Sequence, residues 1–433
     1  MDEKSKRIIS WFKENGGIFN NIEIVYTDDM GYDLKLAKQD QPFELKIPSS
    51  LIINKQKCID CNDLKWKHWL EAINDQFNHI DSIPGKLVLK LFILYHKLYQ
   101  NNTETSFWNP YIDILPKQFN SPICWPEEKK SALKWTSLDI PLTSQTKSLR
   151  QQYFMIQSID EIITWEEWIW SDRVVNSRVW EVPVDEDKTE FALIPLLDLV
   201  NHDENPNCFW EPEFTSDEGN QLPNIQIYYK QDSQIPDQSE GSSTRLTFSY
   251  GSKEIDSWVF SHGFIPNNIE PPTSIMLPNI LLLSPDSIEN DKFHNAKVII
   301  MQLNELSPII QYTLQPGIFD NIDILAQAYI SQLNAEDGFT TNEEGQLFHS
   351  SLPGQSIFDL NEIHQLLIAE GIEQKYRQKF LEQLKSIILE STQKIQVNAN
   401  NFSDDKFLTS ILNYQLEYFN QLIKVIDNEL NSY

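Results

Sequence analysis

Strand-like patterning occurs in two regions of the chain that lie far apart in sequence, and this feature constrains the fold most strongly. Between Ile18 and Ile53, apolar residues alternate with polar ones, which is typical of half-buried strands. Residues 62 to about 170 instead place apolar residues at three- and four-residue steps, as helices do. Strand character then returns in three short segments, at Phe191–Leu197, Asn224–Tyr229 and Arg245–Tyr250. This order predicts an α+β fold.

The remaining segments are predicted to be helical or irregular. Residues 1–16 predict a short amphipathic helix that ends at Gly16 and Gly17. The segment Ser106–Pro116 contains two prolines and is expected to be extended, and the polar segment Gln231–Thr244 is expected to form a loop. Helical patterning resumes after residue 271, at Asp291–Leu314, Ile322–Asn334, Leu360–Ala369, Gln374–Ile395 and Asp404–Leu430.

Charge and hydropathy limit the partners of the chain. Its 63 acidic residues outnumber its 35 basic ones, and the formal net charge at pH 7 is −28. Nucleic-acid binding needs Lys- and Arg-rich surfaces and is therefore not expected. The electrostatic field of the negative charge would attract basic proteins, and the charge would also aid solubility. Apolar stretches such as Leu87–Tyr95 are shorter than the roughly 18 residues of a membrane span, and no secretory signal is recognised. We expect a soluble monomer in the cytoplasm, with the nucleus as a second location.

The spacing of cysteines and histidines does not indicate a metal site or a disulfide framework. Cys58 and Cys61 form a lone CxxC pair, and the other two cysteines, Cys124 and Cys208, are isolated. Because a zinc site would need two further ligands, reduced thiols and no bound metal are expected. The sequence also lacks the GxGxxG, GxxxxGK[ST], GxSxG and HExxH signatures of common nucleotide-binding, hydrolase and metalloprotease sites.

Three separated stretches carry residues that suit a reaction site. They are Asn176–Trp180, the apolar run Leu193–His202, and Phe248–Gly251, which Ser261–Phe264 follows. The second stretch ends in Asn201-His202, and an amide and an imidazole that close an apolar run need hydrogen-bonding partners or face a ligand. Taken alone, this pair is better explained as a turn that contains an internally hydrogen-bonded histidine.

In this order, the three stretches resemble the SET-domain protein methyltransferases. They are most similar to the non-histone branch typified by the Rubisco large-subunit methyltransferase, with the yeast ribosomal-protein and elongation-factor lysine methyltransferases and the actin histidine methyltransferase. Ser106–Pro116 is similar to the S-x-W-x-x-Y-x-x-x-L-P segment of this branch, and Gly31–Ile47 occupies the place of its N-terminal strand-loop-strand. The tail from about residue 275 resembles its substrate-binding domain, so the resemblance covers nearly the whole chain.

The resemblance implies how the chain is divided. It implies a SET β-fold of short strands with a helical insertion (iSET) and a C-terminal all-helical substrate-binding domain. Residues 1–62 would hold the N-terminal helix and the first part of the SET domain, and residues 63–160 the insertion. Residues 161–270 would complete the SET domain with the Asn-His and Tyr-Gly motifs, and residues 271–433 would form the substrate-binding domain.

The resemblance also implies a reaction, in which S-adenosylmethionine gives a methyl group to a protein nitrogen. A free lysine has a pKa near 10.4, so such a site must hold the amine deprotonated, dry and aligned. Tyr250 matches the catalytic tyrosine, and because a phenol is a poor base at pH 7 we expect it to orient the amine. Arg178 matches the arginine that reaches the cofactor's carboxylate, and Asp198 is expected to brace the strand end.

The site residues implied by the resemblance fall into two groups. The cofactor-binding group comprises Tyr32, Asp33, Leu34, Arg178, Asn201, His202 and Tyr250. The substrate-binding group comprises Trp180, His262 and Phe264. No metal ligand is implied.

Four positions depart from the pattern of this branch. The Gly-x-Gly turn reads Gly31-Tyr32-Asp33, the Gly-Glu turn reads Gln41-Pro42-Phe43-Glu44, Ile255 replaces an asparagine and His262 replaces a tyrosine. A carboxylate at Asp33 would either meet the cofactor's amino group or obstruct its pocket, and it lacks the backbone freedom of glycine. Since His262 lies near the target-nitrogen pocket, the degree of methylation or the target residue would be open to change.

The leading functional prediction is therefore a protein-lysine N-methyltransferase that acts on a basic non-histone protein, either a ribosomal protein or a translation elongation factor. One alternative is a catalytically impaired SET-fold protein that serves as a binding module or scaffold. Another alternative is a histidine-directed protein methyltransferase. Affinity for the cofactor distinguishes the scaffold from the two enzymes.

Overall fold

The structure of the 433-residue chain is a computed structural model that describes residues 1–28, 31–38, 41–99, 107–184, 187–214, 222–230, 244–267, 269, 272–279 and 291–433. Ser106 and residues 231–243 of the predicted loop lie outside the described residues. The chain forms two compact units, of which the first comprises Met1–Trp125 and Gln145–Ile269 and the second comprises Pro126–Ser144 and Glu270–Tyr433. The four-part division given above remains a prediction.

The first unit begins with the predicted amphipathic helix, α1 (Glu3–Glu14). The Asp2 carboxylate caps its N-terminus by accepting a hydrogen bond from the Ser5 N–H at 2.8 Å. Ile8 and Phe12 on one face of the helix are fully buried. Gly16, at φ +88°, follows the helix, and a Cβ at Gly17 would lie 2.3 Å from the Phe12 ring. Glycine is therefore required where the chain turns into the first strand.

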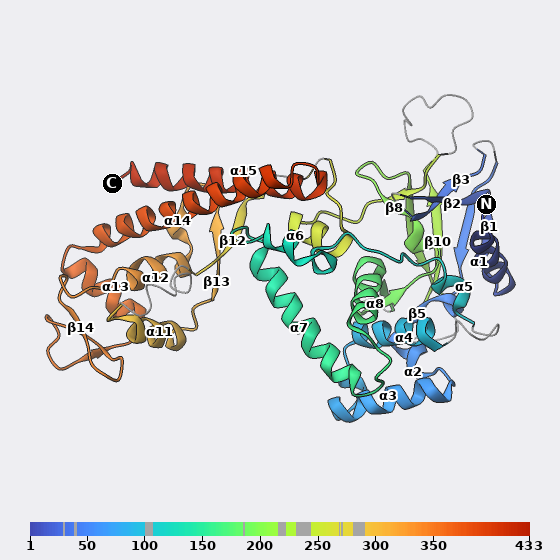
Figure 1. The fold of residues 1–433 in the computed structure, drawn as a ribbon, viewed down its shortest axis with the longest axis horizontal. Helices are drawn as coiled ribbons and strands as arrows, with labels where there is room; N and C mark the ends of the chain where they lie inside the picture. The colour runs from blue at the N-terminus through green and yellow to red at the C-terminus, as the bar shows by residue number, and fades with distance from the viewer. Residues whose placement is uncertain are drawn as a thin grey trace. The chain divides into compact units, whose positions relative to one another are not determined.

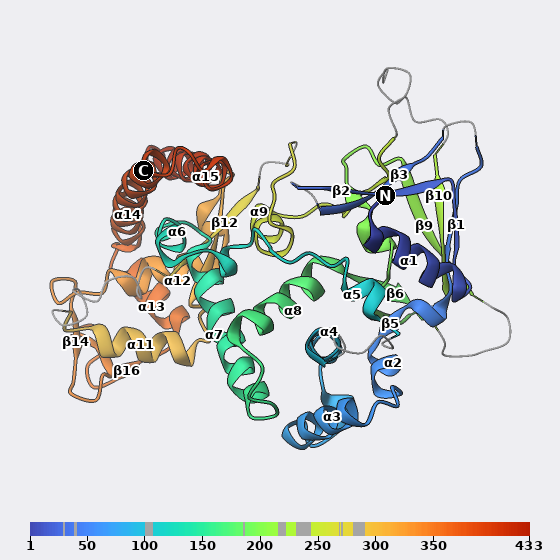
Figure 2. The same ribbon diagram turned by 45° about the vertical axis from the view of Figure 1, so that its right-hand side comes forward.

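In its described residues, the first unit contains four small β-structures, whose strands come from both ends of its sequence (Figure 2). An antiparallel sheet has the order β1 (Ile18–Asn20), β4 (Glu44–Ile47), β10 (Asn224–Tyr229) and β9 (Cys208–Glu213). Another has the order β5 (Ile53–Asn54), β7 (Thr189–Leu193) and β6 (Val179–Pro183). Two pairs complete the set: β2 (Ile22–Thr27) with β3 (Gly31–Leu36), antiparallel, and β8 (Asn201–His202) with β11 (Thr247–Phe248), parallel.

Helices separate the two groups of strands in sequence, as predicted. Those of the first unit are α2 (Lys55–Ile59), α3 (Leu64–Phe77), α4 (Gly85–Tyr99), α5 (Asn109–Ile112), α8 (Trp165–Arg178), α9 (Ile255–Ser257) and the π-helical turn η5 (Trp258–His262). Its 3₁₀ turns are η1 (Ser49–Leu51), η2 (Ile80–Ser82), η3 (Pro122–Cys124) and η4 (Leu197–Leu199). The extended prediction for Ser106–Pro116 is wrong at α5, because Pro110 lies in the first helical turn, where its missing N–H costs nothing.

The second unit is dominated by two long helices, α14 (Glu373–Asn401) and α15 (Lys406–Leu430), which run side by side in Figures 1 and 2. Its other helical elements are α6 (Glu127–Ser131), α11 (His294–Leu303), α12 (Ile322–Ser331), α13 (Leu360–Ala369) and the turn η7 (Ile318–Asp320). Helix α7 (Asp139–Gln157) contains residues of both units.

The C-terminal region is not all-helical, so this part of the prediction is wrong. β12 (Ser274–Pro278) pairs with β13 (Ile309–Thr313), and a second sheet contains β14 (Phe339–Thr341), β15 (Leu347–His349) and β16 (Ser356–Ile357). The helix predicted over Asp291–Leu314 ends at Leu303. Pro308 cannot continue a helix, and Ile310 and Tyr312 are then buried at alternate positions, as in a strand. The α+β fold class is confirmed.

The described residues offer neither a membrane-spanning helix nor a metal-binding cluster. None of their helices is both long and apolar enough to cross a bilayer. No group of three or more His, Cys, Asp or Glu side chains in this part of the chain could hold a metal ion.

Candidate active site

The Asn-His and Tyr-Gly motifs meet where β8 and β11 pair. Thr247 is opposite Asn201 and Phe248 is opposite His202 in this parallel register. Just beyond β11, the Tyr250 N–H donates to Nδ1 of His202 at 3.1 Å, and the Tyr250 hydroxyl donates to the Val200 carbonyl at 2.8 Å. Because Nδ1 accepts, the proton of a neutral His202 resides on Nε2. These two hydrogen bonds fix the phenol of Tyr250 at the end of the buried run that precedes Asn201.

Aromatic rings surround Tyr250. The centroid of its ring lies 5.3 Å from His202, 5.1 Å from His262, 6.3 Å from Trp258 and 6.4 Å from Trp180. Phe264 is 5.2 Å from Trp258 and 6.0 Å from His262. The structure thus brings together the three residues predicted to bind substrate: Trp180, His262 and Phe264. A site lined in this way disfavours a charged amine relative to a neutral one, because apolar walls replace water.

Sequence reasoning missed Trp258, which stacks on Tyr250 with an angle of 17° between the ring planes. The signal for it was present in the sequence. Trp258 precedes His262 by four residues, a spacing that brings two side chains to the same face of a helical turn.

Neither Tyr250 nor His262 carries a charge near pH 7. Burial raises the pKa of Tyr250 to about 12, although the Arg178 cation opposes this shift. Burial lowers the pKa of His262 to about 4, and the positive charge of Lys253 adds to the effect. Tyr250 is therefore a hydrogen-bond donor and a poor base, and His262 is a neutral imidazole.

Arg178 lies at the end of α8 and pairs with Asp198. Its Nη1 donates to the Asp198 backbone carbonyl and lies 3.8 Å from the Asp198 carboxylate, which also accepts the Tyr111 hydroxyl at 2.6 Å. Burial raises the pKa of Asp198, and Arg178 opposes that shift. Nε of Arg178 and Oδ1 of Asp198 are buried without a hydrogen-bond partner in the described part of the chain. The guanidinium therefore keeps an unused donor that a ligand carboxylate could accept.

Asp33, which replaces a glycine of the SET pattern, lies in β3 and has no exposed surface. It is not among the residues with positive φ, so its backbone does not need the freedom of glycine. One carboxylate oxygen forms an ion pair with Nε of Arg245, and the other accepts a hydrogen bond from Nδ2 of Asn201 at 2.9 Å. Burial raises the pKa of Asp33, while Arg245 and Asn201 oppose that shift.

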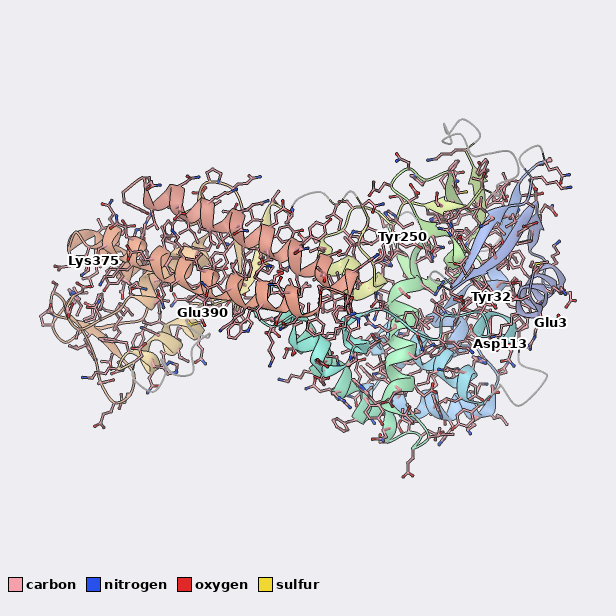
Figure 3. The ribbon with its side chains drawn as sticks, turned by 45° about the horizontal axis from the view of Figure 1, so that its top comes forward. Glu3, Tyr32, Asp113, Tyr250, Lys375 and Glu390 are labelled. Atoms are coloured by element: carbon pink, nitrogen blue, oxygen red, sulfur yellow. The ribbon has the colours of Figure 1, made fainter. Side chains whose placement is uncertain are left out.

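The structure does not bring the side chains of Tyr32 and Leu34 to Tyr250. The Tyr32 hydroxyl donates to the Asp2 carboxylate at 2.7 Å, and Figure 3 shows Tyr32 near Asp113 and apart from Tyr250. Leu34 is fully buried, and its carbonyl accepts the Leu246 N–H at 2.9 Å. Side chains alternate along a strand, so Asp33 points away from its two neighbours. The assignment of all three residues to the cofactor remains a prediction.

A buried polar network holds the turn η5, which carries Trp258 and His262. The Phe260 carbonyl accepts hydrogen bonds from Nη1 of Arg173 at 2.6 Å and from the Ser121 hydroxyl at 2.8 Å. Gly263, at φ +74°, ends the turn, and a Cβ there would lie 2.7 Å from the Asn120 carbonyl. Sequence reasoning missed Arg173, Ser121 and Asn120 because their spacing along the chain gives no sign of these contacts.

Comparison of the sequence with known proteins finds SET-domain relatives. SET domain-containing protein 8 of Schizosaccharomyces pombe is 28% identical over 199 residues, which are 45% of this chain and 41% of that protein. The actin-histidine N-methyltransferase of Gallus gallus is 25% identical over 216 residues, 46% of this chain and 34% of that enzyme. The chain thus matches less than half the length of these relatives. No protein-family model matches it.

Comparison of the fold finds the Rubisco large-subunit methyltransferase, LSMT. The structure of Rubisco LSMT bound to AdoMet aligns with a TM-score of 0.64 and 14% identity, covering 100% of this chain and 93% of that chain. The SET domain of LSMT bound to lysine and AdoHcy aligns with a TM-score of 0.60 and 14% identity, covering 99% and 91%. This chain has the SET fold of LSMT. Together with the SET-domain relatives, this fold confirms the resemblance predicted from the sequence.

Proposed function

We propose that this chain is an S-adenosylmethionine-dependent protein-lysine N-methyltransferase that acts on a basic non-histone protein, either a ribosomal protein or a translation elongation factor. The observation that carries the proposal is the placement of Tyr250, held by Val200 and His202 within a ring of aromatic side chains. Support also comes from the solved LSMT structures, which contain AdoMet, AdoHcy, lysine or monomethyllysine.

The residues present suit such a cofactor. Within the described residues, Arg178 has a free N–H donor for the carboxylate of the cofactor. Asn201 offers an amide at the strand pair, and His202 lies next to Tyr250. When bound, S-adenosylmethionine supplies the methyl group that an amine lone pair attacks as the carbon–sulfur bond breaks. The Tyr250 phenol would orient the incoming nitrogen, and the aromatic rings around it would exclude water. The lysine ammonium would lose its proton to solvent before it enters the site, because Tyr250 is already protonated and His262 is a weak base, and the methylated nitrogen would leave as a cation.

A histidine-directed methyltransferase is the second candidate. Two observations favour it: several relatives are named actin-histidine N-methyltransferase, and His262 stands beside Tyr250 where the SET pattern has a tyrosine. A neutral imidazole is also a nitrogen nucleophile, so the same geometry would serve either target.

Partner and location are part of this proposal. The net charge of −28 favours a basic substrate protein, which long-range attraction would steer to the enzyme. We propose that the protein works as a monomer in the cytoplasm, with the nucleus as a second location.

A methyl-transfer screen tests the proposal. The purified protein is incubated with methyl-labelled S-adenosylmethionine and, separately, with ribosomal proteins, elongation factors and actin, and the labelled residue is then identified by mass spectrometry. Label on lysine in the translational proteins is expected. Label on a histidine would favour the second candidate, and no label together with no cofactor binding would favour a SET-fold scaffold.

Arg178→Ala is expected to weaken binding of S-adenosylhomocysteine by about 1.5–3 kcal/mol, because one charge-assisted hydrogen bond is lost. Titration calorimetry measures the change. The matched control is Arg7→Ala, which removes an exposed arginine whose Nη1 lies 2.8 Å from Asp113 in the same unit. An unchanged dissociation constant for Arg178→Ala would remove Arg178 from the cofactor site.

A further inference from the structure

Asp33 links three segments of the first unit through its side chain. It lies on β3, its partner Asn201 begins β8, and Arg245 lies beside β3 through a backbone bridge with Lys35. The carboxylate is fully buried and uses one oxygen for each partner. The amide of Asn201 is therefore tethered to a group that Arg245 holds in place.

This contact fixes which way the Asn201 amide faces. A carboxylate paired with arginine only accepts hydrogen bonds, so Asn201 must present its NH₂ group to it, and a flipped amide would oppose two oxygens. Oδ1 of Asn201 then points away from Asp33. Within the described residues Oδ1 receives no hydrogen bond, and the Asn201 side chain is half-buried at the strand pair that carries Tyr250. Oδ1 is thus an oriented acceptor that a ligand N–H can reach.

We propose that Asp33 is a positioning residue, which orients the Asn201 amide so that Oδ1 accepts a hydrogen bond from an amino group of the cofactor, while Arg245 anchors Asp33. This inference rests on the proposed function. The proposal gives a role to Asp33, which stands where the SET pattern has glycine. The buried carboxylate is accommodated there because Arg245 pairs with it and Asn201 donates a hydrogen bond to it.

If Asp33 had a purely structural role, its replacement would have a different effect on cofactor binding. If the ion pair with Arg245 only fastened β3 to the segment before β11, removing Asp33 would weaken the fold and the site whether or not Asn201 is present. An orienting role acts through one amide, so its effect must disappear when that amide is removed.

The test is a double-mutant cycle with S-adenosylhomocysteine as the probe. The dissociation constant is measured by calorimetry on the full chain for the unmodified protein, Asp33→Ala, Asn201→Ala and the double variant, with thermal unfolding as a check that each is folded. Asp33→Ala is expected to weaken binding by about fivefold to tenfold, as the loss of one well-placed hydrogen bond does. In the Asn201→Ala background the same change is expected to have less than about a twofold effect.

Two further variants keep the test decisive if Asp33→Ala does not fold. Asp33→Asn retains an oxygen that can accept from the Asn201 amide and is expected to bind within about threefold of the unmodified protein. Glu23→Ala, which removes an exposed carboxylate from the neighbouring strand β2, is the matched control and is expected to change nothing.

The possible results distinguish the role of Asp33 from the proposed function. Unchanged affinity in Asp33→Ala, or an equal loss with and without Asn201, overturns the inference while leaving the proposed function intact. A loss in Asp33→Asn as large as in Asp33→Ala also overturns it. No binding by the unmodified, folded protein contradicts the proposed function itself, and with it the role of Asp33.

Discussion

Replacing Tyr250 with phenylalanine is expected to lower kcat for methyl transfer by roughly a hundredfold or more, the size of effect seen when one hydrogen bond to a reacting group is removed. Binding of S-adenosylhomocysteine is expected to stay within about twofold, because the phenol acts on the incoming nitrogen and not on cofactor affinity. The single O–H of the phenol donates to the Val200 carbonyl at 2.8 Å, so the hydroxyl oxygen is left to accept from the incoming N–H. Loss of the bond to Val200 costs about 0.5–1.5 kcal/mol of stability, too little to unfold the protein.

Tyr153→Phe provides a matched control. The Tyr153 hydroxyl also donates to a backbone carbonyl, that of Ile163 at 3.3 Å, in the same unit but outside the aromatic cluster around Tyr250. Both variants remove a hydroxyl that donates to a backbone carbonyl, and Tyr153→Phe also removes the acceptor of Nε2 of Gln157 at 3.0 Å. A turnover defect confined to Tyr250→Phe therefore identifies chemistry and not folding. Full activity of Tyr250→Phe would show that another residue orients the nitrogen.

The second large effect is on stability. Arg173→Met is expected to lower the free energy of unfolding by about 3–5 kcal/mol, as measured by chemical denaturation. Arg173 is 1% exposed and pairs with Asp172, which also lies 2.6 Å from the ammonium of Lys90 on α4. The substitution leaves a buried carboxylate with one cation and removes a donor from the Phe260 carbonyl. Arg7→Ala, which breaks an exposed ion pair, is expected to cost less than about 1 kcal/mol.

The pH dependence of this effect has a definite sign. Burial alone would raise the pKa of Asp172, but Arg173 and Lys90 more than offset it, and the net shift of the pKa is downward. A lowered carboxyl pKa stabilises the fold above the unfolded-state pKa of about 3.9, and this contribution is lost as the pH falls through the folded-state value. The difference in the free energy of unfolding between Arg173→Met and the unmodified protein should therefore become smaller in acid. A difference below about 1 kcal/mol at pH 7 would mean that the network does not support η5 as described.

Local patterns predicted much of this fold because they depend on neighbours in sequence. The Asp2-capped helix that buries Ile8 and Phe12, the strand Asn224–Tyr229 and the helix Leu360–Ala369 all follow from periodicity and end signals. Periodicity failed at Ile309–Thr313, where a five-residue segment with three apolar residues is compatible with a helix or a strand until Pro308 is considered.

The candidate site was predictable only in part. The ordered motifs located Tyr250, Asn201, His202 and Arg178, since each stands in a short recognisable stretch. The residues that bind and orient these side chains lie elsewhere in the chain: Asp33 accepts a hydrogen bond from Asn201 on another strand, and Arg245 forms an ion pair with Asp33. Pairs of this kind are set by tertiary packing, which no local pattern encodes. For that reason the sequence alone did not decide whether the Asp33 carboxylate meets the cofactor or obstructs its pocket.

Cofactor binding underlies every role proposed above: this chain is expected to bind S-adenosylmethionine at the site built around Arg178, Asn201 and Tyr250. Titration calorimetry of the folded 433-residue chain with S-adenosylmethionine and with S-adenosylhomocysteine measures this binding. We predict binding of either ligand with a micromolar dissociation constant and one site per chain. The absence of binding at high micromolar ligand, in a sample shown to be folded, would rule out this cofactor site and identify the chain as a SET-fold protein that does not use the cofactor.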